Sequence, residues 1–80
     1  MRIYDRENGR QLEAITLFLT PSEMRELADS AAGLSVDILQ QHAHIPDASL
    51  RREITLAVYT AETLGEFDSE SLGVIGDVTD

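Results

Sequence analysis

The sequence predicts an α+β fold class: a small antiparallel sheet, in the chain order β-β-α-β-β, with one amphipathic helix packed on one face. Three observations predict it. An Asn-Gly pair at positions 8–9 is typical of a two-residue hairpin turn, because both central residues of that turn need positive φ. A helix start signal occupies residues 20–23, and residues 52–60 alternate between apolar and polar side chains, as a half-buried strand does.

The N-terminal hairpin is expected to place its second strand at residues 12–20. Apolar residues alternate there with a period of two, which separates the side chains of a strand onto two faces. The face expected in the core carries three aliphatic side chains, Ile15, Leu17 and Leu19. The opposite face carries Ala14, Thr16 and Phe18.

The helix start has three agreeing parts. Thr20 is the expected N-cap, Pro21 stands at the first helical position where no amide hydrogen bond is lost, and Glu23 completes a capping box. One apolar stripe follows at helical spacing, made of Met24, Leu27, Ala28 and Ala31. The helix either ends in a left-handed cap at Gly33 or continues to about Gln40, and we favour the continuation or a second short turn after the helix.

A second hairpin is expected after the helix. Residues 42–45 alternate, residues 46–49 have the composition of a turn, and residues 52–60 alternate again. The apolar face of the last strand carries Ile54, Leu56 and Val58. We therefore expect residues 1–60 to form a single α+β domain.

The segment at residues 61–80 is acidic. All its charged residues are Asp or Glu, and apolar side chains are interleaved with them. It is too apolar to be wholly solvated, so we expect part of it to dock on the domain or on a partner. Residues 72–75 are predicted to form a short edge strand.

Strict alternation leaves one sheet face open, with aromatic and polar side chains and no charge at its centre. Such a face in a small chain is typical of a surface for a partner protein or a second copy of the chain. The alternatives are that the acidic segment folds across it or that it is an ordinary exposed face. The residues predicted to bind a partner are Thr16, Phe18, His42, His44, Thr55 and Tyr59.

The sequence shows no catalytic constellation. A general acid–base pair needs a carboxyl group whose pKa is raised by burial, and no acidic residue interrupts an apolar run. Cysteine, lysine, a nucleophile elbow and a glycine-rich phosphate loop are all absent from the sequence. Two histidines are fewer ligands than a structural zinc site requires. We therefore expect no enzymatic activity, no metal and no cofactor.

The charge balance favours a basic protein partner. Fifteen acidic residues against six arginines give a net charge of −9, which repels nucleic acid and anionic membrane. The alternative is that the acidity only keeps the chain in solution. No apolar run approaches the length of a membrane span, and a chain without cysteine agrees with a cytoplasmic location.

Three segments in succession carry a resemblance to a known group of proteins. They are a strand AITLFL at residues 14–19, a helix opening LTPSEMREL at residues 19–27, and, after a histidine-containing strand, a strand REITLAVY at residues 52–59. With them, residues 13–60 resemble the small immunity proteins of bacterial polymorphic toxin systems. The resemblance implies a small α+β inhibitor that neutralises a toxin by blocking it, without catalysis of its own.

Two functions fit these observations. The first is a non-catalytic protein-binding module, most concretely an immunity-type inhibitor whose acidic surface meets a basic toxin such as a nuclease. The alternative is a structural or regulatory module that self-associates as a homodimer through the open sheet face or an edge strand. Acidic mimicry of nucleic acid ranks third, because the carboxylates are scattered along the sequence rather than set in a regular row.

Overall fold

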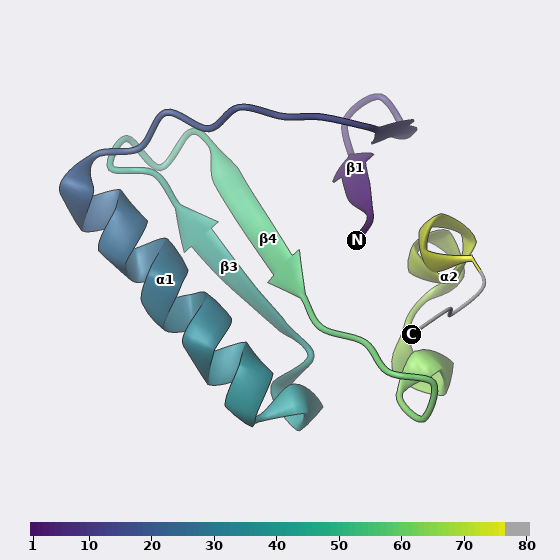
Figure 1. Cartoon of the computed structure of the whole chain (residues 1–80). Helices are drawn as coiled ribbons and strands as arrows, with labels where there is room; N and C mark the ends of the chain where they lie inside the picture. Colours follow the sequence, from purple (N-terminus) through teal and green to yellow (C-terminus); the bar gives the residue numbers. More distant parts are fainter. Residues whose placement is uncertain (77–80) are drawn as a thin grey trace. The chain divides into compact units, whose positions relative to one another are not determined.

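The computed structural model describes residues 1–76 and confirms the α+β class (Figure 1). It contains two antiparallel two-stranded hairpins and two α-helices. The chain divides into two compact units: one is Phe18–Tyr59, and the other combines Met1–Leu17 with the described residues from Thr60 onward. The part of the predicted acidic segment at residues 77–80 lies outside the described residues.

The unit Phe18–Tyr59 is a helix packed on a hairpin. Helix α1 (Pro21–Val36) is followed by a short 3-10 turn, η1 (Ile38–Gln40), and by strands β3 (His42–Pro46) and β4 (Glu53–Ala57). Helix α1 contacts both strands and lies beside them in Figure 1. The predicted helix-on-sheet packing is therefore present in this unit.

Helix α1 begins where the local signal predicts. The Thr20 hydroxyl accepts a hydrogen bond from the Glu23 amide at 3.2 Å, and the Glu23 carboxylate accepts one from the Thr20 amide at 2.9 Å, which completes the capping box. The helix continues through Gly33 to Val36, as we favoured over a cap at Gly33. Its last turn is closed by the Asp37 amide, which donates to the Gly33 carbonyl at 2.9 Å.

The buried face of α1 differs from the predicted stripe. Leu34 is buried and Leu27 is half-buried, whereas Met24 is 51% exposed and Ala28 and Ala31 are exposed. The less exposed positions of the helix are instead 27, 30 and 34, which follow one another at helical spacing, and α1 contacts both β3 and β4. The helix is thus rotated relative to the face that periodicity alone selected.

Strands β3 and β4 keep the predicted alternation. Ile45 pairs with Ile54 and Ala43 pairs with Leu56 in the antiparallel register, and all four side chains are buried or half-buried. Ile45 is only 3% exposed. The core of this unit therefore lies between α1 and these two pairs.

The N-terminal hairpin is present but shorter than predicted. Strands β1 (Ile3–Asp5) and β2 (Arg10–Leu12) pair antiparallel, and Gly9 adopts a φ of 65°. Its loop has four residues rather than two, because the Asp5 carboxylate accepts hydrogen bonds from the amides of Glu7 and Asn8 and so builds a wider turn.

The predicted strand at residues 12–20 is wrong beyond its first residue. Strand β2 ends at Leu12, and residues 13–20 form no regular element. Residues 1–76 therefore form two separate two-stranded sheets in place of one sheet. Alternating side chains make a segment suitable for a strand, but the strand forms only where a neighbouring backbone supplies its hydrogen bonds.

The segment after Thr60 forms helical turns. It contains a 3-10 turn, η2 (Leu64–Glu66), and helix α2 (Ser69–Ile75), so the predicted edge strand at residues 72–75 is wrong. The Asp68 carboxylate caps α2 by accepting a hydrogen bond from the Ser71 amide at 2.7 Å, and this local cap selects a helix over a strand.

Three side chains of the N-terminal segment hold α2 within its unit. Arg2 donates through Nε to the Ile75 carbonyl at 3.0 Å. The Tyr4 hydroxyl donates to Glu70 at 2.7 Å, and Arg6 contacts the same carboxylate at 3.1 Å. The described part of the acidic segment is therefore docked on the N-terminal hairpin.

Candidate functional site

The candidate site is the face of the β3–β4 hairpin opposite α1, called here the open face. Because side chains alternate along each strand, the residues that flank the core pairs point away from the helix. Four exposed polar side chains of the open face come from adjacent positions on the two strands: His42, His44, Glu53 and Thr55.

His44 is the centre of the open face. Its Nδ1 lies 3.0 Å from the Thr55 hydroxyl and 3.2 Å from a Glu53 carboxylate oxygen. The rings of His42 and His44 meet edge to face with centroids 5.1 Å apart. When His44 carries a proton it forms an ion pair with Glu53, but both side chains are about half exposed, so water screens that pair.

The structure brings together three of the six predicted partner-binding residues, namely His42, His44 and Thr55. Phe18 begins the same unit and is 92% exposed, and Tyr59 ends it and is half-buried, but neither lies in a strand. Thr16 belongs to the other unit. Phe18 and Thr16 leave the predicted face because residues 13–20 do not form the strand that was to carry them.

Glu53 is a member of the open face that the sequence analysis did not select. It stands two positions before Thr55 on β4, and residues two apart on a strand share a face. The alternation that selected Thr55 is therefore the signal that finds Glu53 as well. Its carboxylate makes the open face ionic on one side, which the prediction of an uncharged centre did not include.

An apolar groove lies between the second half of α1 and the end of β4. Its volume is about 230 Å³. It is lined by Ala31, Leu34, Ser35, Leu56, Ala57 and Val58. None of these side chains titrates, so the groove can hold an apolar group but supplies no acid or base.

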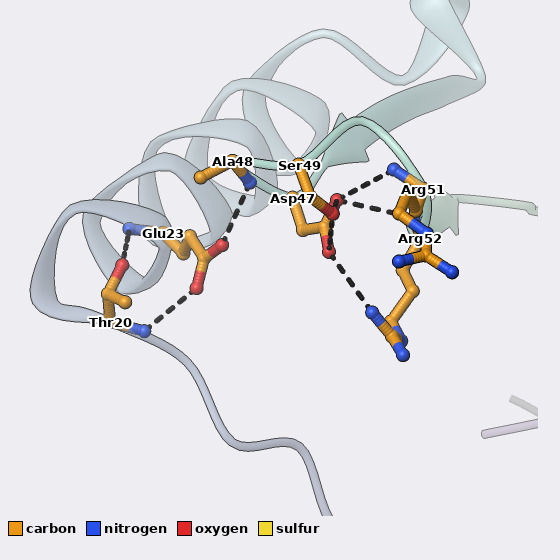
Figure 2. Close-up of polar contacts among 7 residues, drawn as sticks. All are labelled: Thr20, Glu23, Asp47, Ala48, Ser49, Arg51 and Arg52. Carbon is orange, nitrogen blue, oxygen red and sulfur yellow. Dashed lines mark hydrogen bonds and ion pairs between the residues drawn. The ribbon is translucent and has the colours of Figure 1, made fainter.

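The loop between β3 and β4 is tied to the start of α1 (Figure 2). The second carboxylate oxygen of Glu23 accepts a hydrogen bond from the Ala48 amide at 3.2 Å, while the first remains in the capping box with Thr20. Hydrogen bonds from the Thr20 amide and then the Ala48 amide hold the pKa of Glu23 below its ordinary value. One carboxylate thus joins the helix cap to the hairpin loop.

Asp47 organises the rest of this loop. Its carboxylate accepts hydrogen bonds from the amides of Arg51 and Arg52 at 3.0 and 3.2 Å and from the Ser49 hydroxyl at 2.9 Å, as Figure 2 shows. Partial burial raises the pKa of Asp47, but the hydrogen bonds from Arg52, Ser49 and Arg51 together outweigh it and leave the pKa below its ordinary value. The side chains of both arginines remain exposed beside it.

Large apolar side chains are exposed in the unit Phe18–Tyr59. Phe18, Val36, Leu39 and Leu50 are each at least three-quarters exposed. Leu34 and Ile45 are the buried hydrophobic residues of the same unit. This unit therefore leaves several large apolar side chains in water around a small core.

The described part of the chain has neither a metal-binding cluster nor a membrane-spanning helix. No group of three or more His, Cys, Asp or Glu side chains within residues 1–76 is arranged to hold a metal ion. No helix in that part is long and apolar enough to cross a membrane.

Comparison with known proteins gives this chain no family: no family model, no curated protein and no solved structure matches it.

Proposed function

We propose that the chain is a non-catalytic protein-binding module for a basic protein, of the kind that an immunity-type inhibitor of a bacterial toxin represents, acting in the cytoplasm. The observation that carries the proposal is the exposure of large apolar side chains on a strongly acidic chain, above all Phe18 at 92%. Aromatic side chains in such positions are the usual anchors of protein interfaces.

The charge distribution supports a basic partner. The exposed surface of α1 carries Glu26 and Asp29 beside one arginine, and the exposed Asp37 directly follows the exposed Val36. A basic partner would be attracted by this surface before contact, which accelerates association, and would then bury the apolar side chains.

The carboxyl groups with shifted pKa values also favour binding over catalysis. Backbone amides and neighbouring polar side chains lower the pKa of Asp5, Glu23, Asp47 and Asp68. These groups therefore stay ionised at neutral pH, whereas a general acid needs a carboxyl group with a raised pKa. They supply fixed negative charge and hold loops in place.

The test is the capture of a partner from a lysate of the native source by the tagged chain at low and high ionic strength, with the bound protein identified by mass spectrometry. We expect one stoichiometric basic protein that is lost at high ionic strength, because salt screens the attraction. Capture of an acidic protein, or binding indifferent to salt, would contradict the proposal.

A matched pair of variants tests the anchor. Phe18→Ala should weaken the affinity for the captured partner roughly tenfold, because it removes a ring that is solvent-exposed in the free chain and buried in the complex. Phe18→Leu retains most of the apolar area and should bind nearly as the parent chain does. Equal affinities for Phe18→Ala and the parent chain would remove Phe18 from the interface.

A further inference from the structure

We propose that the chain forms a symmetric dimer in which β4 of one copy pairs antiparallel with β4 of a second copy. The two hairpins then become one four-stranded sheet with a copy of α1 over each half. This inference goes beyond the binding of a basic partner and does not depend on it.

The outer edge of β4 has the hydrogen-bonding groups that such pairing needs. The Val58 amide donates to the Gln41 carbonyl at 2.8 Å and the Asp47 amide to the Arg52 carbonyl at 2.9 Å, which fixes the even-numbered residues of β4 as those bonded to β3. The amides and carbonyls of Glu53, Thr55 and Ala57 therefore point to the outer edge. Within residues 1–76, no backbone hydrogen bond outside the hairpin involves these three residues.

The outer edge of β3 is less suited to pairing. Its outward positions are His42, His44 and Pro46, and proline has no amide hydrogen to donate. The backbone also turns sharply at Gln41, where φ is 67°. Proline on an edge strand is a common protection against pairing with another chain, so the fold blocks one edge and leaves the other available.

The occupant is a second copy because β4 is complementary to itself. A two-fold axis at Thr55 places Thr55 opposite Thr55, Glu53 opposite Ala57, and, on the helix side, Ile54 opposite Leu56. No like charges are directly opposed, and the apolar face continues across the axis. An axis at Glu53 would instead oppose two carboxylates.

One flank of α1 borders β4 and has a matching surface. The 230 Å³ apolar groove lies along β4, and Ala31 and Ser35 of α1 line it. These residues belong to an uncharged flank of the helix that also contains Met24, which is 51% exposed, and Ala28. A sheet that continues past β4 brings the helix of the second copy toward this flank. The dimer thus covers the groove, the flank and the strand edge together.

The first experiment uses the absence of cysteine from the chain. Thr55→Cys places two thiols opposite each other at the axis, where the Cα–Cα separation of a hydrogen-bonded pair, about 5.5 Å, suits a disulfide. We expect a covalent dimer on a non-reducing gel after mild oxidation. His44→Cys is the matched control, because His44 pairs with Thr55 inside the hairpin but lies on the blocked edge, and it should stay monomeric on the gel.

The second experiment measures mass in solution by sedimentation. The parent chain should be a dimer at micromolar concentration, and Thr55→Pro should be a monomer because it removes the outward amide while sparing the bonds to β3. His44→Pro makes the same change on the other edge and should remain a dimer. Circular dichroism tests whether each variant is folded. If Thr55→Pro does not fold, Thr55→Asp is compared with Thr55→Asn instead. Only Thr55→Asp places two negative charges opposite each other at the axis, so only it should be a monomer.

Ionic strength separates this proposal from the proposed function. Salt screens the repulsion between two acidic chains and should strengthen the dimer, whereas it should weaken capture of a basic partner. A parent chain that sediments as a monomer, or equal crosslinking of Thr55→Cys and His44→Cys, would overturn the β4 dimer and leave the binding of a basic partner standing.

Discussion

At the scale of single residues, one carboxylate often serves two contacts. The Glu70 carboxylate accepts a hydrogen bond from the Tyr4 hydroxyl at 2.7 Å and forms an ion pair with Arg6 at 3.1 Å. All three side chains lie on the surface of their unit. The hydrogen bond to Glu70 raises the pKa of Tyr4 above its ordinary value of 10.0, because losing the proton would place two negative charges side by side.

The substitution Glu70→Ala should return the pKa of Tyr4 toward 10.0. It removes both the hydrogen-bond acceptor and the neighbouring charge. The measurement is the pH dependence of the Tyr4 ring signals by NMR, and Glu62→Ala, which removes the same charge elsewhere in the same unit, should leave the pKa of Tyr4 as in the parent chain. An unchanged pKa in Glu70→Ala would show that the Tyr4–Glu70 bond is not formed in solution.

Thr20 makes a single-residue contribution to the start of α1. Thr20→Ala removes the hydroxyl that caps the Glu23 amide and should lower the free energy of unfolding by about 1 kcal/mol, measured by urea denaturation. Thr20→Ser keeps the hydroxyl and should stay within a few tenths of a kcal/mol of the parent chain. Equal losses for both variants would assign the effect to the methyl group and not to the cap.

At the scale of elements, Glu23 couples the start of α1 to the β3–β4 loop. One carboxylate oxygen accepts a hydrogen bond from the Thr20 amide at the helix start, and the other accepts one from the Ala48 amide in the loop. The local sequence predicts the first of these contacts but not the second. The capping box is a local pattern, but the bond to Ala48 spans 25 positions of sequence.

Glu23→Gln should separate the two contacts of this side chain. An amide has one acceptor oxygen, so the variant can keep the cap on Thr20 but loses the acceptor for the Ala48 amide. We expect faster hydrogen exchange at the Ala48 amide with protection at the Thr20 amide retained, measured by NMR. Protection at Ala48 that survives Glu23→Gln would contradict the coupling.

At the scale of the whole molecule, stability should depend on pH at both ends of the range. The pKa values of Glu23 and Asp47 are lowered on folding from ordinary values of 4.5 and 3.8, so their contributions are complete above those values and are lost as pH falls through the folded pKa values. The pKa of Tyr4 is raised, so its contribution is complete below 10.0 and is lost as pH rises through its folded pKa.

We therefore expect the urea midpoint of unfolding to be flat near neutral pH and to fall below pH 4.5 and above pH 10.0. In Glu70→Ala the urea midpoint should fall less above pH 10.0, because the contact that raises the pKa of Tyr4 is removed. Its fall at acid pH should be retained, because Glu23 and Asp47 are unchanged. A midpoint that rises as pH falls below 3.8 would contradict the lowered pKa values.

The sequence determined those features whose cause lies within a few residues. The start of α1 follows from the capping box of Thr20 and Glu23 with Pro21, and the two faces of β3 and β4 follow from strict alternation. These patterns also placed His42, His44 and Thr55 on one face, and these are three of the four side chains of the open face.

Tertiary structure alone decided the rest, because it depends on partners distant in the sequence. Residues 13–20 alternate as well as β4 does, but no neighbouring backbone in the described chain pairs with them. The face that α1 buries depends on its packing against β3 and β4, and α2, which contains residues 72–75, is held by the contacts of Glu70 with Tyr4 and Arg6. Local chemistry therefore determines where elements begin, and pairing and packing determine which of them persist and which face they bury.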